Sequence, residues 1–162
     1  GENLDLSEYL NLETLIIDGK CLKTHLKKIK ISNCKQLIEL SCPNNDLKKL
    51  DLSNNCKLEK LDISNNKFSQ QNLSFLSHLV NLKELKLGNS NSREKGKSRD
   101  KNYFTGDLEP LKNMNKLELL SIRNTEISGS LKSLENMNKL KILDLAHTIL
   151  VKEEADFFIK KK

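Results

Sequence analysis

The sequence predicts an α/β solenoid, a chain wound in repeated turns around one continuous core, with a parallel concave β-sheet of about six strands. Three observations predict it. The pattern L-x-x-L-x-L-x-x-N recurs eight times along 162 residues. Inside each copy, apolar and polar residues alternate with the period of two that is typical of a strand. Most of the copies fall into one series with a regular spacing.

Each strand of the sheet is expected where a copy of the pattern begins. The eight copies begin at Leu12, Leu26, Leu37, Leu47, Leu58, Leu82, Leu117 and Leu140. Neighbouring starts are 14, 11, 10, 11, 24, 35 and 23 residues apart, and a full solenoid turn needs roughly 20 to 29 residues. Omitting Leu26 and Leu47 leaves intervals of 25, 21, 24, 35 and 23 residues. We therefore expect the other six copies to form the concave strands, and Leu26 and Leu47 to begin segments on the back of the turn.

Alternation fixes which side chains face the core. Positions one, four and six of each copy point inward, and positions three, five and seven point outward. A polar residue at position nine can bond backbone groups in the bend that follows the strand. Asn45, Asn55 and Asn66 occupy that position, and its small substitutes are Cys34, Ser90, Thr125 and Thr148.

With these motifs the chain resembles the leucine-rich-repeat family over nearly all of residues 4–150. Residues 26–66 resemble the IRREKO subtype, in which one turn holds two nested units, here 10–11 residues long. Residues 104–145 resemble plant-type repeats. The resemblance implies a right-handed horseshoe or arc with a β-rich convex side in the amino-terminal half. Leu73, Leu76 and Leu79 have a spacing that we interpret as helical, which predicts a helical convex side in the carboxyl-terminal half.

We expect one domain over residues 1–162, as part of a longer protein, because the chain begins inside the repeat pattern. Residues 149–162 predict a capping helix, since Val151, Ala155 and Phe158 fall at i, i+4 and i+7. The interval of 35 residues contains a polar, basic insertion at residues 89–104, and we expect residues 90–102 to be the least ordered internal segment.

The insertion leaves the rim of the concave sheet, where a long loop could contact a partner. Its cations are Arg93, Lys95, Lys97, Arg99 and Lys101. Three interpretations remain open for it: a solvated loop without a role, a loop that contacts a partner, and a contact with nucleic acid.

Composition excludes several classes of protein. Lys and Arg outnumber Asp and Glu by 28 to 22, with both signs interspersed, which indicates a solvated surface. The chain contains no apolar run long enough to cross a membrane. The four cysteines form no C-x-x-C pair, so we expect free thiols, no metal site and an intracellular, cytoplasmic setting.

Nothing in the sequence indicates catalysis or a cofactor. The three histidines stand in unrelated phases of the repeat, and no nucleophile or paired carboxylates accompany them. We therefore expect a non-enzymatic protein that needs no cofactor.

The outward positions of the six strands should form columns across the concave face. Position three reads Thr14, Glu39, Lys60, Glu84, Leu119 and Ile142. Position five reads Ile16, Ser41, Asp62, Lys86, Ser121 and Asp144. Position seven reads Asp18, Pro43, Ser64, Gly88, Arg123 and Ala146. The carboxyl-terminal half of the face thus exposes Leu119 and Ile142 beside charged residues, a combination typical of protein contact surfaces.

These observations favour a protein-interaction module, a sensor or scaffold that binds a protein partner on its concave face. The predicted contact residues are Glu39, Lys60, Asp62, Glu84, Lys86, Leu119, Ser121, Arg123, Ile142, Asp144 and Ala146, with the five insertion cations as loop contacts. The alternatives are a structural spacer inside a longer solenoid, and a weak binder of acidic surfaces through the basic loop. We expect a monomer, and nucleic acid is disfavoured because the face carries no aromatic residue for stacking.

Overall fold

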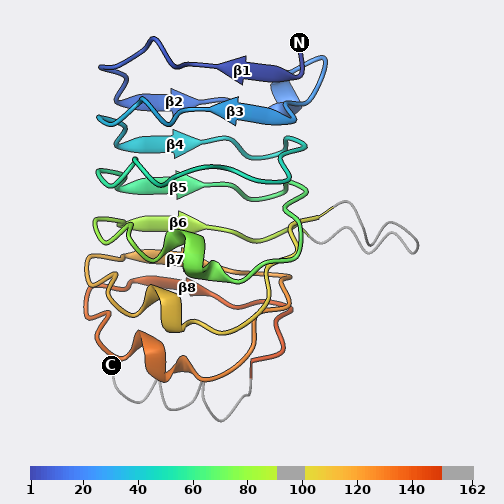
Figure 1. Cartoon of the computed structure of the whole chain (residues 1–162). Helices are drawn as coiled ribbons and strands as arrows, with labels where there is room; N and C mark the ends of the chain where they lie inside the picture. The colour runs from blue at the N-terminus through green and yellow to red at the C-terminus, as the bar shows by residue number, and fades with distance from the viewer. Residues whose placement is uncertain (91–100, 151–162) are drawn as a thin grey trace, which may run out of the picture.

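The computed structural model describes residues 1–90 and 101–150, which form a single coil of stacked turns (Figure 1). Its strands are β1 (Asn3–Asp5), β2 (Thr14–Ile16), β3 (Lys28–Lys30), β4 (Glu39–Ser41), β5 (Lys60–Asp62), β6 (Glu84–Lys86), β7 (Leu119–Ser121) and β8 (Ile142–Asp144). Its helical segments are all of the 3-10 type: η1 (Gly19–Cys21), η2 (Leu73–Leu76), η3 (Glu109–Leu111) and η4 (Leu131–Leu134). Residues 91–100, most of the segment predicted to be the least ordered, lie outside the described residues. The predicted capping helix beyond residue 150 lies outside them as well.

One parallel sheet contains six strands in the order β2-β4-β5-β6-β7-β8. Each strand starts two residues after the first leucine of a predicted concave copy, so all six predicted strands are confirmed. β4 pairs directly with β5, with Leu40 opposite Leu61. The Leu47 copy therefore does not insert between them, which confirms that a unit of 10–11 residues is half a turn.

The back of the amino-terminal half carries a second, two-stranded parallel sheet of β1 and β3. Their arrows run opposite to those of the larger sheet in Figure 1. The Leu47 copy buries its leucines but forms no strand. Isolated backbone hydrogen bonds join this copy to the adjoining turns, from Asp46 N to Leu26 O (2.8 Å) and from Lys67 N to Leu47 O (2.9 Å). The convex side is thus β-rich only in its first turns.

The expected helical convex side of the carboxyl-terminal half is not formed, because no α-helix occurs in the described part of the chain. The buried residues of each back segment are spaced by three. They are Leu73, Leu76 and Leu79; Leu108, Leu111 and Met114; and Leu131, Leu134 and Met137. A spacing of three matches the 3-10 helix, and segments this short cannot offset the cost of nucleating an α-helix. η2 contacts η3, and η3 contacts η4, so these short turns stack along the back.

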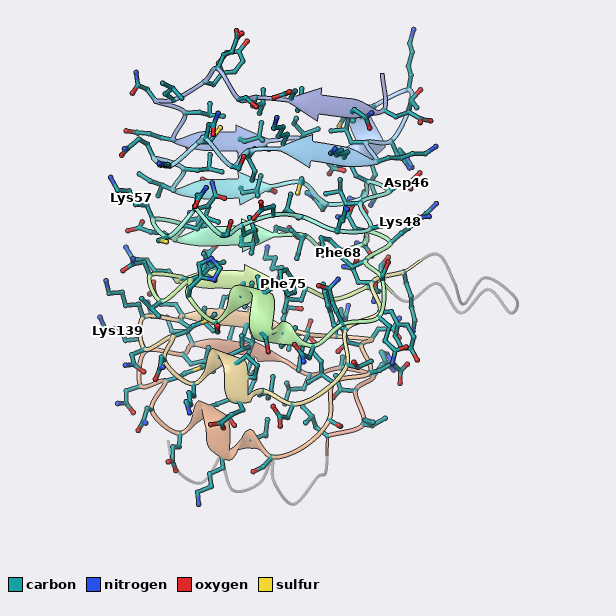
Figure 2. The ribbon with its side chains drawn as sticks, in the orientation of Figure 1. Asp46, Lys48, Lys57, Phe68, Phe75 and Lys139 are labelled. Atoms are coloured by element: carbon teal, nitrogen blue, oxygen red, sulfur yellow. The ribbon has the colours of Figure 1, made fainter. Side chains whose placement is uncertain are left out.

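Three phenylalanines fill the core where the thin turns give way to those with 3-10 backs. The ring centroids of Phe68 and Phe104 are 5.3 Å apart, and Phe75 lies 6.2 Å and 5.8 Å from them. Figure 2 shows Phe68 and Phe75 at this junction. Aromatic rings supply the extra volume that the wider turns need.

Buried asparagines hold the bends that follow β4 and β5. Asn66 Nδ2 donates to the carbonyls of Cys42 and Ile63 (3.0 and 3.1 Å), and its Oδ1 accepts from Leu47 N (3.1 Å). Asn45 makes the equivalent bonds one turn earlier. Each of these side chains therefore bonds backbone groups of its own bend and of the preceding turn, as predicted for position nine.

The insertion shifts this role to another residue. Position nine of the β6 copy was predicted to be Ser90, but Ser90 is exposed. Asn102, after the insertion, is buried, and its Nδ2 donates to Ile63 O (2.8 Å) and Leu87 O (3.0 Å). Asn89 and Asn102 also exchange two hydrogen bonds, Asn89 Nδ2 to Asn102 O (3.1 Å) and Asn102 N to Asn89 Oδ1 (2.9 Å). The two hydrogen bonds join residues near the two ends of the insertion, so that the series of buried asparagines in successive turns continues beyond it.

Candidate binding surfaces

The outward columns of the concave face are those that the sequence predicts. Glu39, Lys60, Glu84, Leu119 and Ile142 stand opposite one another in strand register. Ser41, Asp62, Lys86, Ser121 and Asp144 form the next column, in register as well. The strand register confirms this placement, whereas the binding role of these residues stays a prediction.

Leu119 and Ile142 are direct neighbours on β7 and β8. Ile142 leaves 55% of its surface exposed, while Leu119 is half-buried, so Leu119 offers less surface than the sequence suggests. Ala146 is also half-buried. The pair nevertheless forms an apolar area on a face whose other outward residues in the middle strands are charged or polar.

Charged groups lie next to this pair. Arg123 Nε is 3.2 Å from Asp144 Oδ2, and Ser121 Oγ donates to the same oxygen at 3.2 Å. Both charged side chains are about one-third to two-fifths exposed, so water screens the pair and it stabilises the fold little. Asp144 Oδ1 accepts from Ala146 N (3.1 Å), which orients the carboxylate across the end of the sheet.

The middle of the face carries mixed charge. A shallow depression of about 80 Å³ is lined in part by Glu39, Lys60, Asp62, Glu84 and Lys86. Asp62 is held in place, because its Oδ1 accepts from the backbone N (3.0 Å) and the Oγ (2.6 Å) of the residue two positions on. So small a depression suits single side chains of a partner better than a small-molecule ligand.

Of the predicted loop contacts, only Lys101 belongs to the described residues. Its Nζ lies 3.8 Å from a Glu126 carboxylate oxygen, and its side chain is 30% exposed. Arg93, Lys95, Lys97 and Arg99 lie outside the described residues.

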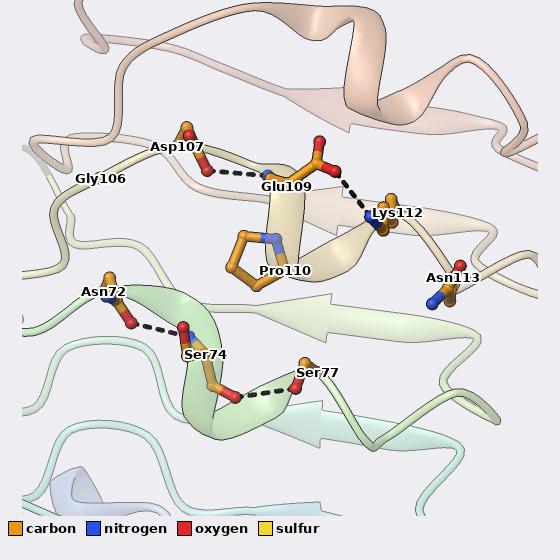
Figure 3. Close-up of a pocket in the computed structure, with 9 residues that line it drawn as sticks. All are labelled: Asn72, Ser74, Ser77, Gly106, Asp107, Glu109, Pro110, Lys112 and Asn113. Carbon is orange, nitrogen blue, oxygen red and sulfur yellow. Dashed lines mark hydrogen bonds and ion pairs between the residues drawn. The ribbon is translucent and has the colours of Figure 1, made fainter.

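The back of the carboxyl-terminal half has a polar pocket of about 500 Å³ between η2 and η3 (Figure 3). Its polar groups bond one another: Asn72 accepts from Ser74 N, and Asp107 accepts from Glu109 N, both at 3.0 Å. A hydrogen bond from Lys112 holds the pKa of Glu109 below its usual value. The Asn72 bond caps η2, and the Asp107 bond holds the first residue of η3, which explains these residue types without a ligand.

A third hollow, which was not predicted from the sequence, lies on the back of the amino-terminal half. We call it the basic cleft; it has a volume of about 810 Å³, and its charged lining residues are Lys27, Lys28, Asp46, Lys48, Lys49 and Lys67. A signal for it exists in the sequence, because the Lys27-Lys28 pair recurs 21 residues later as Lys48-Lys49. Charge on the concave columns and in the insertion does not reveal the cleft, since its lysines belong to the back of the turns.

Neither a metal centre nor a membrane span occurs in the described structure. Residues 1–90 and 101–150 contain no group of three His, Cys, Asp or Glu side chains that could hold a metal ion. No helix in those ranges has the length and hydrophobicity to cross a bilayer. All four cysteines are free thiols, and burial raises the pKa of Cys42 to about 12.

The sequence matches no protein-family model, and no curated protein matches it either. Solved structures, in contrast, resemble the fold closely. An internalin from Listeria monocytogenes is similar over 94% of this chain and 40% of its own, with 22% identity and a TM-score of 0.72. The ectodomain of the receptor kinase GASSHO1/SCHENGEN3 from Arabidopsis thaliana is similar over 91% of this chain and 17% of its own, with 27% identity and a TM-score of 0.71.

A third similar structure is the ectodomain of the Arabidopsis thaliana receptor kinase SOBIR1, with 30% identity and a TM-score of 0.59. It is matched over 74% of this chain and 62% of its own length. The chain therefore spans less than two thirds of the length of each of these three proteins. The recurring leucine pattern, the six-stranded parallel sheet and these similarities show that the chain is a leucine-rich-repeat protein.

Proposed function

We propose that the chain is a non-catalytic module that binds a protein on the carboxyl-terminal half of its concave face. The observation that carries this proposal is the pairing of Leu119 with Ile142 beside the Arg123–Asp144 ion pair. Burying an exposed aliphatic side chain contributes roughly 1.5–3 kcal/mol before the cost of association. The charges next to the pair would set the orientation and the association rate of the partner.

Similar proteins support a binding role of this kind. The GASSHO1/SCHENGEN3 ectodomain was crystallised in complex with CASPARIAN STRIP INTEGRITY FACTOR 2. A solenoid presents a continuous sheet whose outward residues a partner can contact over several turns. We also propose an intracellular setting, which the four free thiols support.

A crosslinking experiment tests the site and identifies the partner at the same time. A photoreactive amino acid replaces Ile142 in one sample and Ile16 in another, and crosslinked proteins are identified by mass spectrometry. Ile16 is the matched control, because it lies on the same sheet at β2 and is 63% exposed. We expect a protein that crosslinks at Ile142 and not at Ile16.

The affinity of the identified partner is then measured for a double variant, Leu119→Lys with Ile142→Asp. These substitutions preserve the sheet, because Leu119 stands between Glu84 and Ile142 and the column would then alternate in charge. We expect binding to weaken by about tenfold or more, against less than about twofold for Ile16→Asp. Equal effects of the two variants, or no crosslink at Ile142, would favour the structural spacer.

A further inference from the structure

The basic cleft is the largest of the three hollows described above. It lies at the edge of the coil where Asp46 and Lys48 are labelled in Figure 2, across the molecule from Lys57 and Lys139. Asp46 directly follows Asn45, the buried asparagine of the bend after β4. The cleft therefore opens where the chain passes from the concave sheet to the back.

The stacking of the turns places its lysines in rows. Lys27 and Lys48 hold equivalent positions in turns 21 residues apart, as do Lys28 and Lys49. Lys67 belongs to the next turn, and its backbone N donates to Leu47 O at 2.9 Å. Adjacent backbones in such a stack lie about 4.8 Å apart, so the lysines of neighbouring turns extend from adjacent backbone positions. Like charges in adjacent positions repel each other, and an anion bound among them would offset that repulsion.

The lysines of the cleft outnumber its acidic groups. Asp46 is the one carboxylate among the described lining residues, and its Oδ1 lies 3.2 Å from Lys67 Nζ and 3.4 Å from His25 Nδ1. Lys27 pairs with Glu2 at 2.9 Å, outside the lining. Lys28, Lys48 and Lys49 are exposed, and none of them has an ion-pair partner in the described structure.

We propose that the basic cleft binds a small molecule that carries several phosphate groups. A volume of about 810 Å³ falls within the range of small-molecule sites. Lysine ammonium groups bind phosphate as point charges, and the three of the lining that have no ion-pair partner in the described structure, Lys28, Lys48 and Lys49, match an anion of multiple charge. Ser69 and Gln71, also in the lining, add hydrogen-bonding groups at one end.

The lining disfavours a macromolecular ligand. Its described residues include no aromatic side chain on which a nucleic-acid base could stack. They also include none of the Arg, Tyr and Trp residues that anchor most protein interfaces. The concave site proposed above lies on other residues, so the two proposals stand independently.

The phosphate groups could belong to a soluble metabolite or to a lipid headgroup, since both present the same chemistry to lysine. The first test therefore uses inorganic tripolyphosphate, in titration calorimetry at low ionic strength on the 162-residue chain. We expect saturable binding of one tripolyphosphate, weakened by added salt, because salt screens the exposed charges.

The decisive comparison uses two triple variants with the same loss of charge. Lys28→Gln, Lys48→Gln and Lys49→Gln remove the unpaired cations of the cleft, and we expect affinity to fall by about tenfold or more. Lys35→Gln, Lys132→Gln and Lys139→Gln are the control, because these exposed lysines lie outside the cleft lining and outside the predicted concave contacts. We expect the control to change affinity by less than about twofold. Equal weakening in both variants, or no saturable binding by the unchanged chain, would overturn the proposal.

Sedimentation with vesicles distinguishes the two sources of phosphate. The vesicles contain phosphatidylcholine with or without phosphatidylinositol bisphosphate. Binding to the bisphosphate vesicles that the cleft variant loses and the control keeps would identify a lipid headgroup as the ligand. Tripolyphosphate binding without vesicle binding would identify a soluble phosphate compound.

Discussion

Replacing Asn66 by Ala tests whether the buried asparagines stabilise the solenoid through one particular hydrogen bond. Asn66 is 1% exposed and bonds four backbone groups. Its Nδ2 donates to the carbonyls of Cys42, Ile63 and Ser64. Each of these carbonyls keeps another donor in the variant, from Asn45 Nδ2, Asn102 Nδ2 and Asn44 N respectively.

The bond to Leu47 is different. The buried Leu47 N–H donates to Asn66 Oδ1 at 3.1 Å. Asn66 Oδ1 is the acceptor that the structure assigns to this N–H group. Leaving a buried donor without an acceptor costs about 1–3 kcal/mol. With the shared bonds and the lost packing of the amide, we expect Asn66→Ala to lower the free energy of unfolding by about 3 kcal/mol.

Asn55→Ala is the matched control. Asn55 is fully buried, and its Nδ2 donates to Ile31 O (3.2 Å) and Cys34 O (3.0 Å). Both carbonyls also accept backbone N–H groups, from Cys34 and Leu37. The Oδ1 atom of Asn55 has no hydrogen-bond partner in the described structure. The substitution therefore leaves no donor unpaired, and we expect a loss of only about 1 kcal/mol.

The measurement is urea unfolding followed by circular dichroism, with the slope m compared between variants. An unchanged m with a lower midpoint attributes the effect to stability rather than to a change in the unfolded chain. The difference between the two variants should be about 2 kcal/mol, the cost of the unpaired Leu47 N–H. Losses that agree within about 0.5 kcal/mol would refute the assignment of this bond as the stabilising one.

Single contacts support three further predictions. Gly19→Ala should destabilise the amino-terminal turns strongly, because a Cβ there would lie 1.6 Å from the Asn44 carbonyl oxygen; thermal unfolding measures it. Cys42 should react with a thiol reagent more slowly than the two exposed cysteines, since burial raises its pKa; equal rates would contradict this. The hydrogen bond from Lys141 lowers the pKa of Glu118. This hydrogen bond therefore stabilises the fold at neutral pH, and its stabilisation is lost as acid protonates the Glu118 carboxylate. Lys141→Gln should return the pKa of Glu118, followed by NMR, towards its usual value.

The strands and columns could be predicted because they depend on local alternation. Each inward leucine determines the direction of its neighbours, so Leu61 facing the core places Lys60 and Asp62 outside. The regular spacing of the copies then places equivalent residues side by side. The register of Leu119 with Ile142 follows from these two facts alone.

The role of Asn102 could not be predicted from the repeat pattern. The insertion separates this residue from its strand, so a search for a fixed offset selects Ser90 instead. Only the three-dimensional path returns Asn102 to the carbonyls of Ile63 and Leu87. A long-range contact of this kind leaves no local periodicity.

The predicted helical convex side was wrong for a different reason. Leucines at spacings of three are compatible with one face of an α-helix and with a 3-10 helix, and the two diverge only over several turns. η2 contains just Leu73–Leu76, so the sequence offered too few residues to separate them. The same spacing of three recurs in all three back segments, and this recurrence favours the 3-10 helix more strongly than any one segment does.

The two proposed surfaces should act independently because of the way a solenoid is built. Each turn contacts only its neighbouring turns, so a structural change in one turn affects a distant turn only through the turns between them. β4, which precedes the cleft residue Asp46 in the same turn, and β7, which carries Leu119, are three strand steps apart in the sheet, a separation of about 14 Å. This distance exceeds the Debye length of about 8 Å at physiological salt, so phosphate charge in the cleft is largely screened at the concave site. A partner on the concave face and an anion on the back can thus occupy the chain together without altering each other's affinity.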